Sequence, residues 1–178
     1  YSLNPVMTIG QQIAEAWREH KGGSRKAAML AAIDLLEQVK IRDAAAVAKR
    51  YPHEVSGGMG QRVMIAMMLA PDPELLIADE PTSALDATVQ AEILKLIDDL
   101  VSARGMGLIL ISHDLPLVSH FCDRVAVMYA GRIVELLDAG QLQQAQHPYT
   151  RGLLACLPSL KHPRERLPVL QRDAAWRE

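Results

Sequence analysis

The sequence predicts an α/β fold in which parallel strands alternate with helices, joined to a segment that is helical throughout. Two continuous apolar runs carry this prediction, at residues 75–78 and 108–111, because such runs are typical of strands buried on both faces. Residues 87–104 lie between the runs and repeat apolar side chains at helical spacing, as a crossover between parallel strands does. The 178 residues are 49% hydrophobic, which is enough for a buried core.

Residues 1–60 predict helices and turns without a strand. Thr8 and Gln11 have the spacing of a capping box and open a first helix, which the glycines at 22–23 end. The apolar stripe of this helix consists of Ile9, Ile13 and Trp17. A second helical stripe, closing near Val39, consists of Met29, Ile33 and Leu36.

The helices of the α/β part have recognisable ends. A helical pattern at residues 61–70 stops before Pro71. Gly105 is placed to end the helix between the two strands. Asp114 and Pro116 predict the cap and first turn of a further helix.

The last part of the chain predicts a hairpin followed by an extension. Residues 125–128 and 133–136 are apolar runs joined by a turn at Gly131, which predicts an antiparallel hairpin at the edge of the sheet. Residues 141–178 predict a short helical stretch and then a loosely held tail. The chain thus divides into a helical part at 1–60, an α/β part at 61–140 and the extension at 141–178.

Composition excludes several classes of protein. The formal net charge is −2, and the chain has only 2 Trp, 4 Tyr and 1 Phe, so nucleic acid is not expected as a partner. The two cysteines, Cys122 and Cys156, are too few for a disulfide framework. No run of about 18 uncharged apolar residues predicts a spanning helix, and no basic-then-apolar leader opens the chain.

Two adjacent carboxylates follow the first apolar run. Asp79 and Glu80 come at the carboxyl end of this strand, where open α/β sheets bind their ligands. Neighbouring residues of an extended segment point to opposite sides, so Asp79 can hold Mg²⁺ through water while Glu80 polarises an attacking water. Taken alone, the pattern also fits two solvated carboxylates, and for an isolated match that simpler interpretation is favoured.

Three further segments could face a phosphate. Residues 55–62 place small residues and Ser56 before an apolar helix, where main-chain N–H groups and the helix dipole favour an anion. His113 ends the second strand and can bridge a phosphate and a water, and Asp86 closes a turn before the helix at 87–104. Alone, these segments also fit a glycine-rich loop, an ordinary polar residue and an ordinary helix cap.

Together, in this order and spacing, the segments resemble the ATP-binding subunit of ABC transporters. Residues 56–61 resemble the signature motif, 75–80 the Walker B strand, 83–86 the D-loop and His113 the switch histidine. The resemblance covers nearly the whole chain and implies a P-loop NTPase fold of the ABC ATPase type with a helical subdomain.

The signature departs from the usual Leu-Ser-Gly-Gly-Gln in a way that indicates one branch of the family. Val55 and Met59 replace the leucine and the glutamine, and Gln61 follows two positions later. This departure is familiar in importers of peptides, nickel and glutathione, and residues 2–9 and 147–151 also resemble that oligopeptide/dipeptide branch.

Two motifs of the family are missing from the sequence. None of the 11 glycines precedes a lysine, so the phosphate-binding loop Gly-x-x-x-x-Gly-Lys-[Ser/Thr] is absent. The Q-loop glutamine is expected just upstream of Tyr1, because Gln11 and Gln12 lie in a different context. We therefore expect an incomplete fold, the carboxyl portion of a longer subunit, which is inactive by itself.

The resemblance implies an ATPase subunit that energises peptide import at the cytoplasmic face of the inner membrane. Its implied cofactors are ATP and Mg²⁺. Its implied partners are a second ATPase subunit, transmembrane permease subunits and a periplasmic or extracellular substrate-binding protein. The implied nucleotide-binding residues are Ser56, Gly57, Gly58, Met59, Gln61 and Asp86; Asp79 holds Mg²⁺ through water, and Glu80 and His113 are catalytic. Import of nickel or glutathione, or a soluble ABC ATPase without a transport role, remains an alternative.

Overall fold

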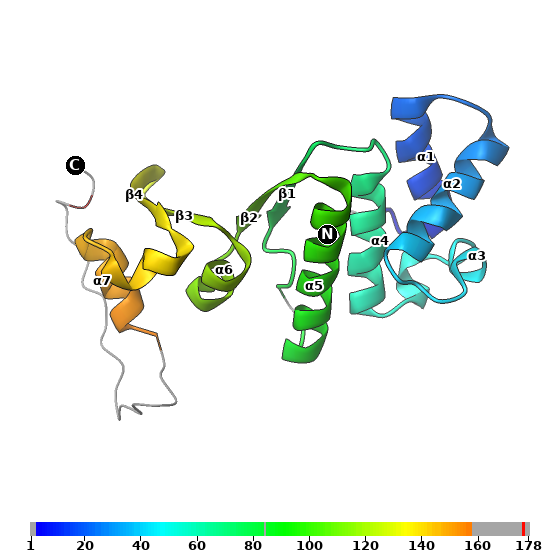
Figure 1. The fold of residues 1–178 in the computed structure, drawn as a ribbon. Coiled ribbons are helices and arrows are strands. Elements are labelled where there is room, and N and C mark those ends of the chain that lie inside the picture. Colours follow the sequence, from blue (N-terminus) through cyan, green and yellow to red (C-terminus); the bar gives the residue numbers. More distant parts are fainter. Residues whose placement is uncertain (1–2, 84, 158–175, 177–178) are drawn as a thin grey trace. The chain divides into compact units, whose positions relative to one another are not determined.

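The computed structural model describes residues 3–83, 85–157 and 176, and the chain divides into two compact units (Figure 1). The first unit is Tyr1–Ile111 and the second is Ser112–Glu178. The division into three parts at residues 60 and 140 stays a prediction. The predicted tail after residue 157 lies outside the described residues except for Trp176.

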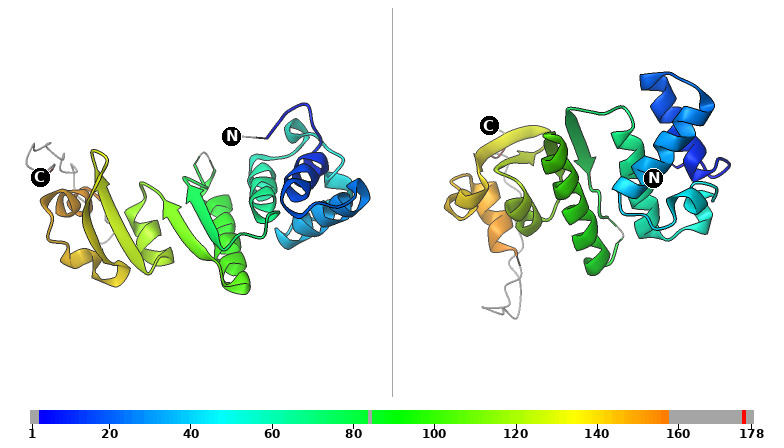
Figure 2. Two further views of the ribbon diagram at one scale, coloured as in Figure 1. Left: turned by 90° about the horizontal axis from the view of Figure 1, so that it is seen from above. Right: turned by 45° about the vertical axis from the view of Figure 1, so that its right-hand side comes forward.

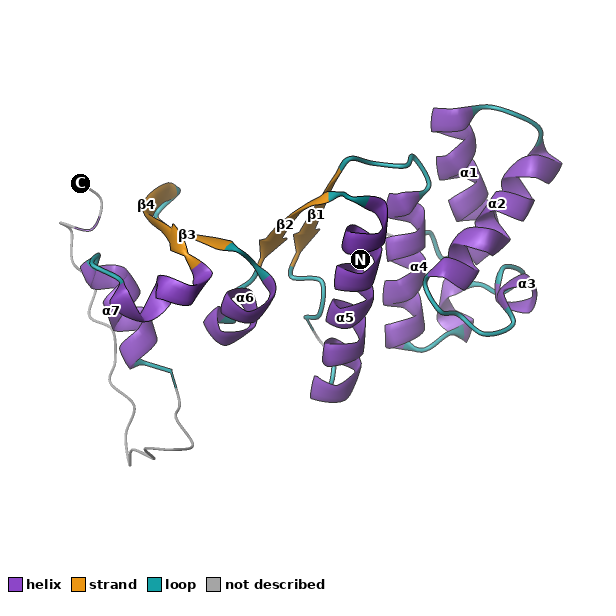
Figure 3. Cartoon of the chain, viewed as in Figure 1, coloured by secondary structure: helices purple, strands orange, loops and turns teal. Residues whose placement is uncertain are grey.

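The first unit begins with helices, and Figure 3 shows only helix and loop before the first strand. They are α1 (Ile9–Lys21), α2 (Arg25–Gln38), α3 (Ala44–Val47), the 3-10 helix η1 (Pro52–Glu54) and α4 (Gly57–Leu69). The predicted capping box is confirmed: Gln11 N donates to Thr8 Oγ1, and Thr8 N donates to Gln11 Oε1. Gly22 follows α1 with φ +72°, a conformation that glycine adopts without strain.

The buried stripe of α2 differs from the predicted one. Ala28, Ala32 and Leu35 are buried together with the predicted Leu36, while Met29 and Ile33 are only partly buried. The large side chains suggested a stripe one position away because alanine gives a weak apolar signal. Helix α2 packs against α1, and its four buried residues belong to the same core as Ile9 and Ile13 of α1.

Two parallel strands complete the first unit. β1 (Leu75–Asp79) pairs with β2 (Gly107–Ile111), and α5 (Ala87–Arg104) connects them, as the sequence predicts. Gly105 ends α5 in the left-handed conformation, with φ +62°. Figure 2 shows the strands beside α5, and Leu76 packs into the same core as Ile93 and Leu96.

The expectation that both faces of these strands are buried is wrong for the described residues. Leu75, Ile77, Ile109 and Ile111 are each about half exposed, between 47% and 55%. The sheet of this unit has two strands, and α5 packs against the face that carries Leu76. A continuous apolar run therefore indicates a strand that can be buried on both faces. In this unit the described residues cover only one face of each strand.

The second unit contains α6 (Leu115–Phe121), β3 (Arg124–Tyr129), β4 (Arg132–Asp138), the 3-10 helix η2 (Ala139–Gln144) and α7 (Pro148–Ala155). The predicted hairpin is confirmed, and Gly131 has φ +80° in its turn. It forms a two-stranded sheet within the second unit, and its place at the edge of the first sheet stays a prediction.

The residues 147–151 are anchored to the hairpin. Glu135 Oε1 on β4 accepts hydrogen bonds from Gln146 N at 2.6 Å and His147 N at 3.1 Å, at the start of α7. Burial of the Glu135 carboxyl opposes its ionisation. These N–H groups and the Thr150 hydroxyl, whose geometry falls short of a hydrogen bond, nevertheless lower the pKa of Glu135. The ring of Tyr149 also packs against that of Tyr129 on β3, with ring centroids 4.6 Å apart and the planes tilted by 48°.

None of the described helices is long and apolar enough to cross a membrane.

Candidate nucleotide site

The glycine-rich segment forms the first turn of a helix. The sequence places a helix at residues 61–70, but α4 already begins at Gly57, with Ser56 as its N-cap. Ser56 Oγ accepts a hydrogen bond from Met59 N at 3.3 Å, and Ser56 O accepts one from Gly60 N at 2.8 Å. Ser56 and Gly57 are exposed, so the positive end of the helix is open to solvent.

The two glycines have different surroundings. A Cβ at Gly57 would lie 3.8 Å from Leu85 Cδ2, which is ordinary contact. A Cβ at Gly58 would lie only 2.8 Å from Val89 Cγ1 on α5, a distance at which something must shift. The first turn of α4 therefore lies beside the segment that connects β1 to α5.

The other two signature residues lie on the same helix. Met59 is partly buried and packs against the main hydrophobic core. Gln61 is partly buried on the next turn of α4.

The two predicted carboxylates occupy the carboxyl end of β1. Asp79 is its last residue, is exposed, and is opposite Ile111 of β2. Glu80 is partly buried and has φ +46°, a left-handed conformation that is uncommon outside glycine. Its N–H donates to Ile111 O at 2.9 Å, and its carbonyl accepts from Ser83 N at 3.1 Å. Strained backbone of this kind is concentrated at functional sites.

Asp86 is the N-cap of α5. Its Oδ1 accepts hydrogen bonds from Thr88 N and Val89 N, both at 3.1 Å. The ordinary cap that the sequence allowed is therefore present. Residue 84 of the same turn lies outside the described residues.

His113 belongs to the second unit. It is exposed and comes two residues after the end of β2. Its neighbour Ser112 accepts a hydrogen bond from Asp114 N at 3.1 Å, and Asp114 caps α6 as the sequence predicts. The first unit thus contains the signature residues, Asp79, Glu80 and Asp86, while His113 lies in the other unit.

Sequence reasoning missed the side chains that join these segments. Arg62 on α4 donates to Val39 O at 3.1 Å and to Glu92 Oε2 on α5 at 3.0 Å. The available signal was a charged residue in an otherwise apolar helix. Gln12, considered only as a Q-loop candidate, is buried and bonds to the main chain of Asn4 and Met7.

Comparison with known proteins identifies close relatives. A family model described as "ABC transporter" matches residues 1–83. The glutathione import ATP-binding protein GsiA of Escherichia coli (strain K12) is 54% identical over 160 residues, which are 89% of this chain and 26% of that protein. A Brucella abortus (strain 2308) protein, provisionally named a peptide import ATP-binding protein, is 52% identical over 171 residues, or 96% of this chain and 52% of that protein. The chain thus spans between about a quarter and about a half of these relatives.

Solved structures give the same result for the fold. The dimeric structure of MJ0796, a bacterial ABC transporter cassette, matches with a TM-score of 0.66 and 26% identity, over 78% of this chain and 59% of that one. The same cassette has been solved with ADP and Pi bound. The cassette cbiO1 from Clostridium perfringens, part of the ABC transporter complex cbiONQ, matches with a TM-score of 0.69 and 26% identity, over 80% and 55%. The chain is therefore similar over most of its length to ATP-binding proteins of ABC transporters, and it has part of the P-loop NTPase fold of ABC transporter cassettes.

Proposed function

We propose that this chain is part of the ATP-hydrolysing subunit of an ABC importer for peptides. One observation carries the proposal. A single compact unit holds the signature turn, which is the cap and first turn of α4 at residues 56–60, next to the segment that leads from Glu80 to α5. In ABC ATPases the signature turn contacts ATP held by the partner subunit, and the carboxylates after the strand serve ATP held by the phosphate loop of their own subunit. The import role is supported by the names of the relatives at 52% and 54% identity.

The signature turn is proposed to bind the terminal phosphate of an ATP held by a second subunit. Ser56 and Gly57 are exposed at the start of α4, whose 13 residues give the N-terminus a partial positive charge. Gly58, Met59 and Gln61 continue the same turn and its flank. Closure then depends on ATP, because both subunits contact the same phosphate chain.

Asp79 fits a role as the Mg²⁺ ligand of the subunit's own nucleotide. No group of three or more acidic, histidine or cysteine side chains forms a metal cage in the described parts of the chain. A single exposed carboxylate suits Mg²⁺, which keeps several waters and binds one or two carboxylates together with substrate phosphates. When bound, Mg²⁺ neutralises charge on the phosphates.

Glu80 is proposed as the general base. Its carboxylate would accept the proton of the water that attacks the terminal phosphate, and its main-chain hydrogen bonds to Ile111 and Ser83 fix the segment that presents it. His113 is proposed to orient that water and the phosphate. Asp86 is proposed to contact the nucleotide region of the closed pair while it caps α5.

The transport complex is proposed to contain two ATPase subunits, transmembrane permease subunits and a substrate-binding protein. The subunit would lie at the cytoplasmic face of the membrane, with residues 1–60 as the helical subdomain that meets the permease. Residues 61–140 would belong to the ATPase core and 141–178 to the extension of the oligopeptide branch. Because a separate binding protein selects the cargo, this chain does not determine it.

Glutathione is a second candidate cargo, favoured by the relative at 54% identity that is named for glutathione import. Uptake into proteoliposomes separates the candidates. The complete transporter is reconstituted with its binding protein, and ATP-dependent uptake of a labelled dipeptide, glutathione and Ni²⁺ is compared. We expect peptide uptake that requires ATP; uptake of Ni²⁺ alone, or ATP hydrolysis without any membrane partner, would contradict the proposal.

A further inference from the structure

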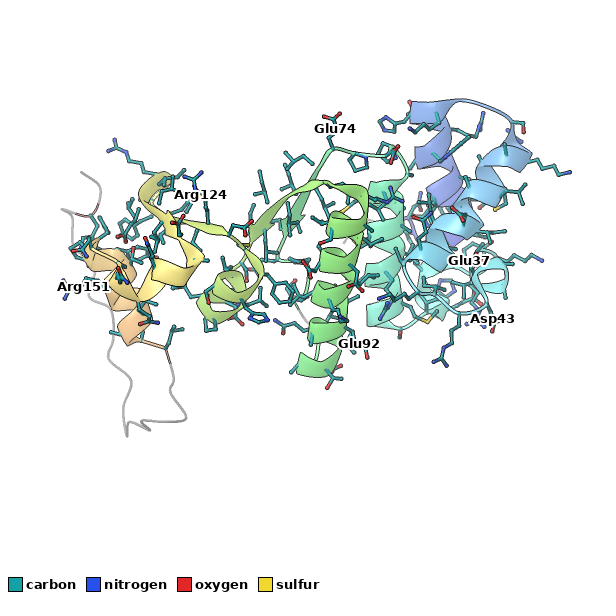
Figure 4. All side chains as sticks on the ribbon, in the orientation of Figure 1. Glu37, Asp43, Glu74, Glu92, Arg124 and Arg151 are labelled. Carbon is teal, nitrogen blue, oxygen red and sulfur yellow. The ribbon has the colours of Figure 1, made fainter. Side chains whose placement is uncertain are left out.

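Helices α4 and α5 contact each other through one face of each. Gly58 of α4 meets Val89 of α5, and Arg62, one turn further along α4, pairs with Glu92, one turn further along α5. Positions four or three residues apart lie on the same side of a helix, so these two contacts form a continuous line. Figure 4 labels Glu92 on α5.

The contact between Gly58 and Val89 depends on glycine having no side chain. A Cβ at Gly58 would come within 2.8 Å of Val89 Cγ1, closer than real Cβ contacts. The neighbouring Gly60 provides a contrast, because a Cβ there meets nothing within 4 Å. Space is therefore limiting at residue 58 and not at residue 60.

The second contact depends on the forked shape of arginine. One guanidinium nitrogen of Arg62 donates to the carbonyl of Val39, the residue that ends α2, and another donates to Glu92. The Arg62 side chain is only 16% exposed, while that of Glu92 is 58% exposed. The three donors of a lysine lie on a single nitrogen, so a lysine could not place one nitrogen on each of the two partners as this arginine does.

We infer that Gly58 and Arg62 are positioning residues that hold the signature turn of α4 against α5. The inference rests on the proposed function. Helix α5 begins after Asp86, six positions from Glu80, so the contact fixes the signature turn relative to the segment that carries the catalytic carboxylate. On this inference the packing against Val89 requires a glycine at residue 58. This requirement is separate from any contact that Gly58 makes with nucleotide.

The test for Gly58 is rescue by a smaller partner. Gly58→Ala, Val89→Ala and the double variant are made in the complete transporter. For each, the maximal rate of ATP hydrolysis, the affinity of the isolated subunit for ATP and the unfolding temperature are measured. We expect Gly58→Ala to lower the maximal rate about tenfold with unchanged ATP affinity, since overpacking displaces the turn. Val89→Ala should restore most of that rate in the double variant.

The control for stability is Gly60→Ala, which should not lower the unfolding temperature, because its Cβ meets nothing within 4 Å and alanine favours a helix over glycine. A double variant as slow as Gly58→Ala would overturn the inference, because it would mean that a Cβ at residue 58 interferes with nucleotide directly. Unfolding temperature reports the Gly58–Val89 contact without ATP hydrolysis. Failure of the unaltered transporter to hydrolyse ATP would contradict the proposed function, and the positioning role with it. Hydrolysis without rescue would contradict only the positioning role.

The test for Arg62 is a double-mutant cycle with Glu92. Arg62→Met and Glu92→Gln should each lower the maximal rate, and the double variant should be no slower than Arg62→Met, because both substitutions remove the same pair. Asp99→Asn is the matched control: it removes the Lys40–Asp99 ion pair, 2.6 Å long, from the same helix. Additive losses in the cycle, or Arg62→Met behaving like Asp99→Asn, would overturn the role of Arg62.

Discussion

Glu80 is held in a backbone conformation that costs about 1–2 kcal/mol for a residue with a side chain. Hydrogen bonds to Ile111 and Ser83 maintain it at the end of β1. Ala130, directly after β3, has the same left-handed conformation with φ +49°, so the conformation by itself does not mark a catalytic residue. The hydrogen bonds fix the backbone that presents Glu80, and its catalytic role stays a proposal.

A substitution of Ser56 tests the role of the signature turn in ATP-driven pairing of the subunits. Ser56→Arg in the complete subunit should leave ATP binding by a single subunit intact and abolish ATP-driven pairing, because a long cation fills the exposed start of α4. Pairing is measured by size-exclusion chromatography with and without ATP.

Ser24→Arg is the matched control for Ser56→Arg. Ser24 caps α2 in the same way, accepting a hydrogen bond from Ala27 N at 3.1 Å, but lies outside the signature. It should lose helix stability and keep ATP-driven pairing. Unchanged pairing in Ser56→Arg would count against the role of the signature turn.

At the scale of elements, two substitutions of Asp86 distinguish its role as the cap of α5 from a role of its carboxylate at the nucleotide. Asp86→Ala should lower the free energy of unfolding by about 1 kcal/mol, because Thr88 N and Val89 N lose their acceptor. Asp86→Asn keeps an acceptor and should retain most of that stability. Turnover should fall in both variants if the carboxylate itself contacts the nucleotide region. Full turnover in Asp86→Asn would reduce Asp86 to a helix cap.

Local signals predicted helix ends well and burial less well. Thr8, Gly105 and Asp114 each act on neighbours within a few residues, so the caps they form could be predicted from sequence. Whether Ile77 is covered depends on what packs against the sheet, which a local pattern does not specify. The start of α4 at Gly57 was missed because glycine is a poor helix former, and here the Ser56 cap and packing against α5 outweigh that preference.

In the candidate site, too, local features could be predicted from the sequence and long-range contacts could not. The carboxylates and the signature could be predicted because their residue types stand in a recognisable order along the chain. The contacts that join them could not, since Arg62 meets Val39 and Glu92, which are 23 and 30 residues away. Such long-range pairs leave no periodicity in the sequence.

At the scale of the whole molecule, the printed sequence contains a signature and two carboxylates without a Gly-Lys phosphate loop. Residues 1–178 alone should therefore show no appreciable affinity for ATP in calorimetry, because the group that grips the β- and γ-phosphates is missing. Circular dichroism of the same sample serves as the control for folding. Micromolar ATP binding by the folded chain would contradict the division of roles between the signature of one subunit and the phosphate loop of the other.

The most direct measurement is the rate of ATP hydrolysis by the complete transporter with Glu80→Gln, compared with the unaltered protein. The substitution keeps the shape of the side chain and removes the proton acceptor. The expected result is intact ATP binding with turnover lowered by roughly 10²–10⁴-fold. Near-normal turnover would contradict the assignment of Glu80 as the base, and with it the proposal that this chain carries the hydrolytic carboxylates of the subunit.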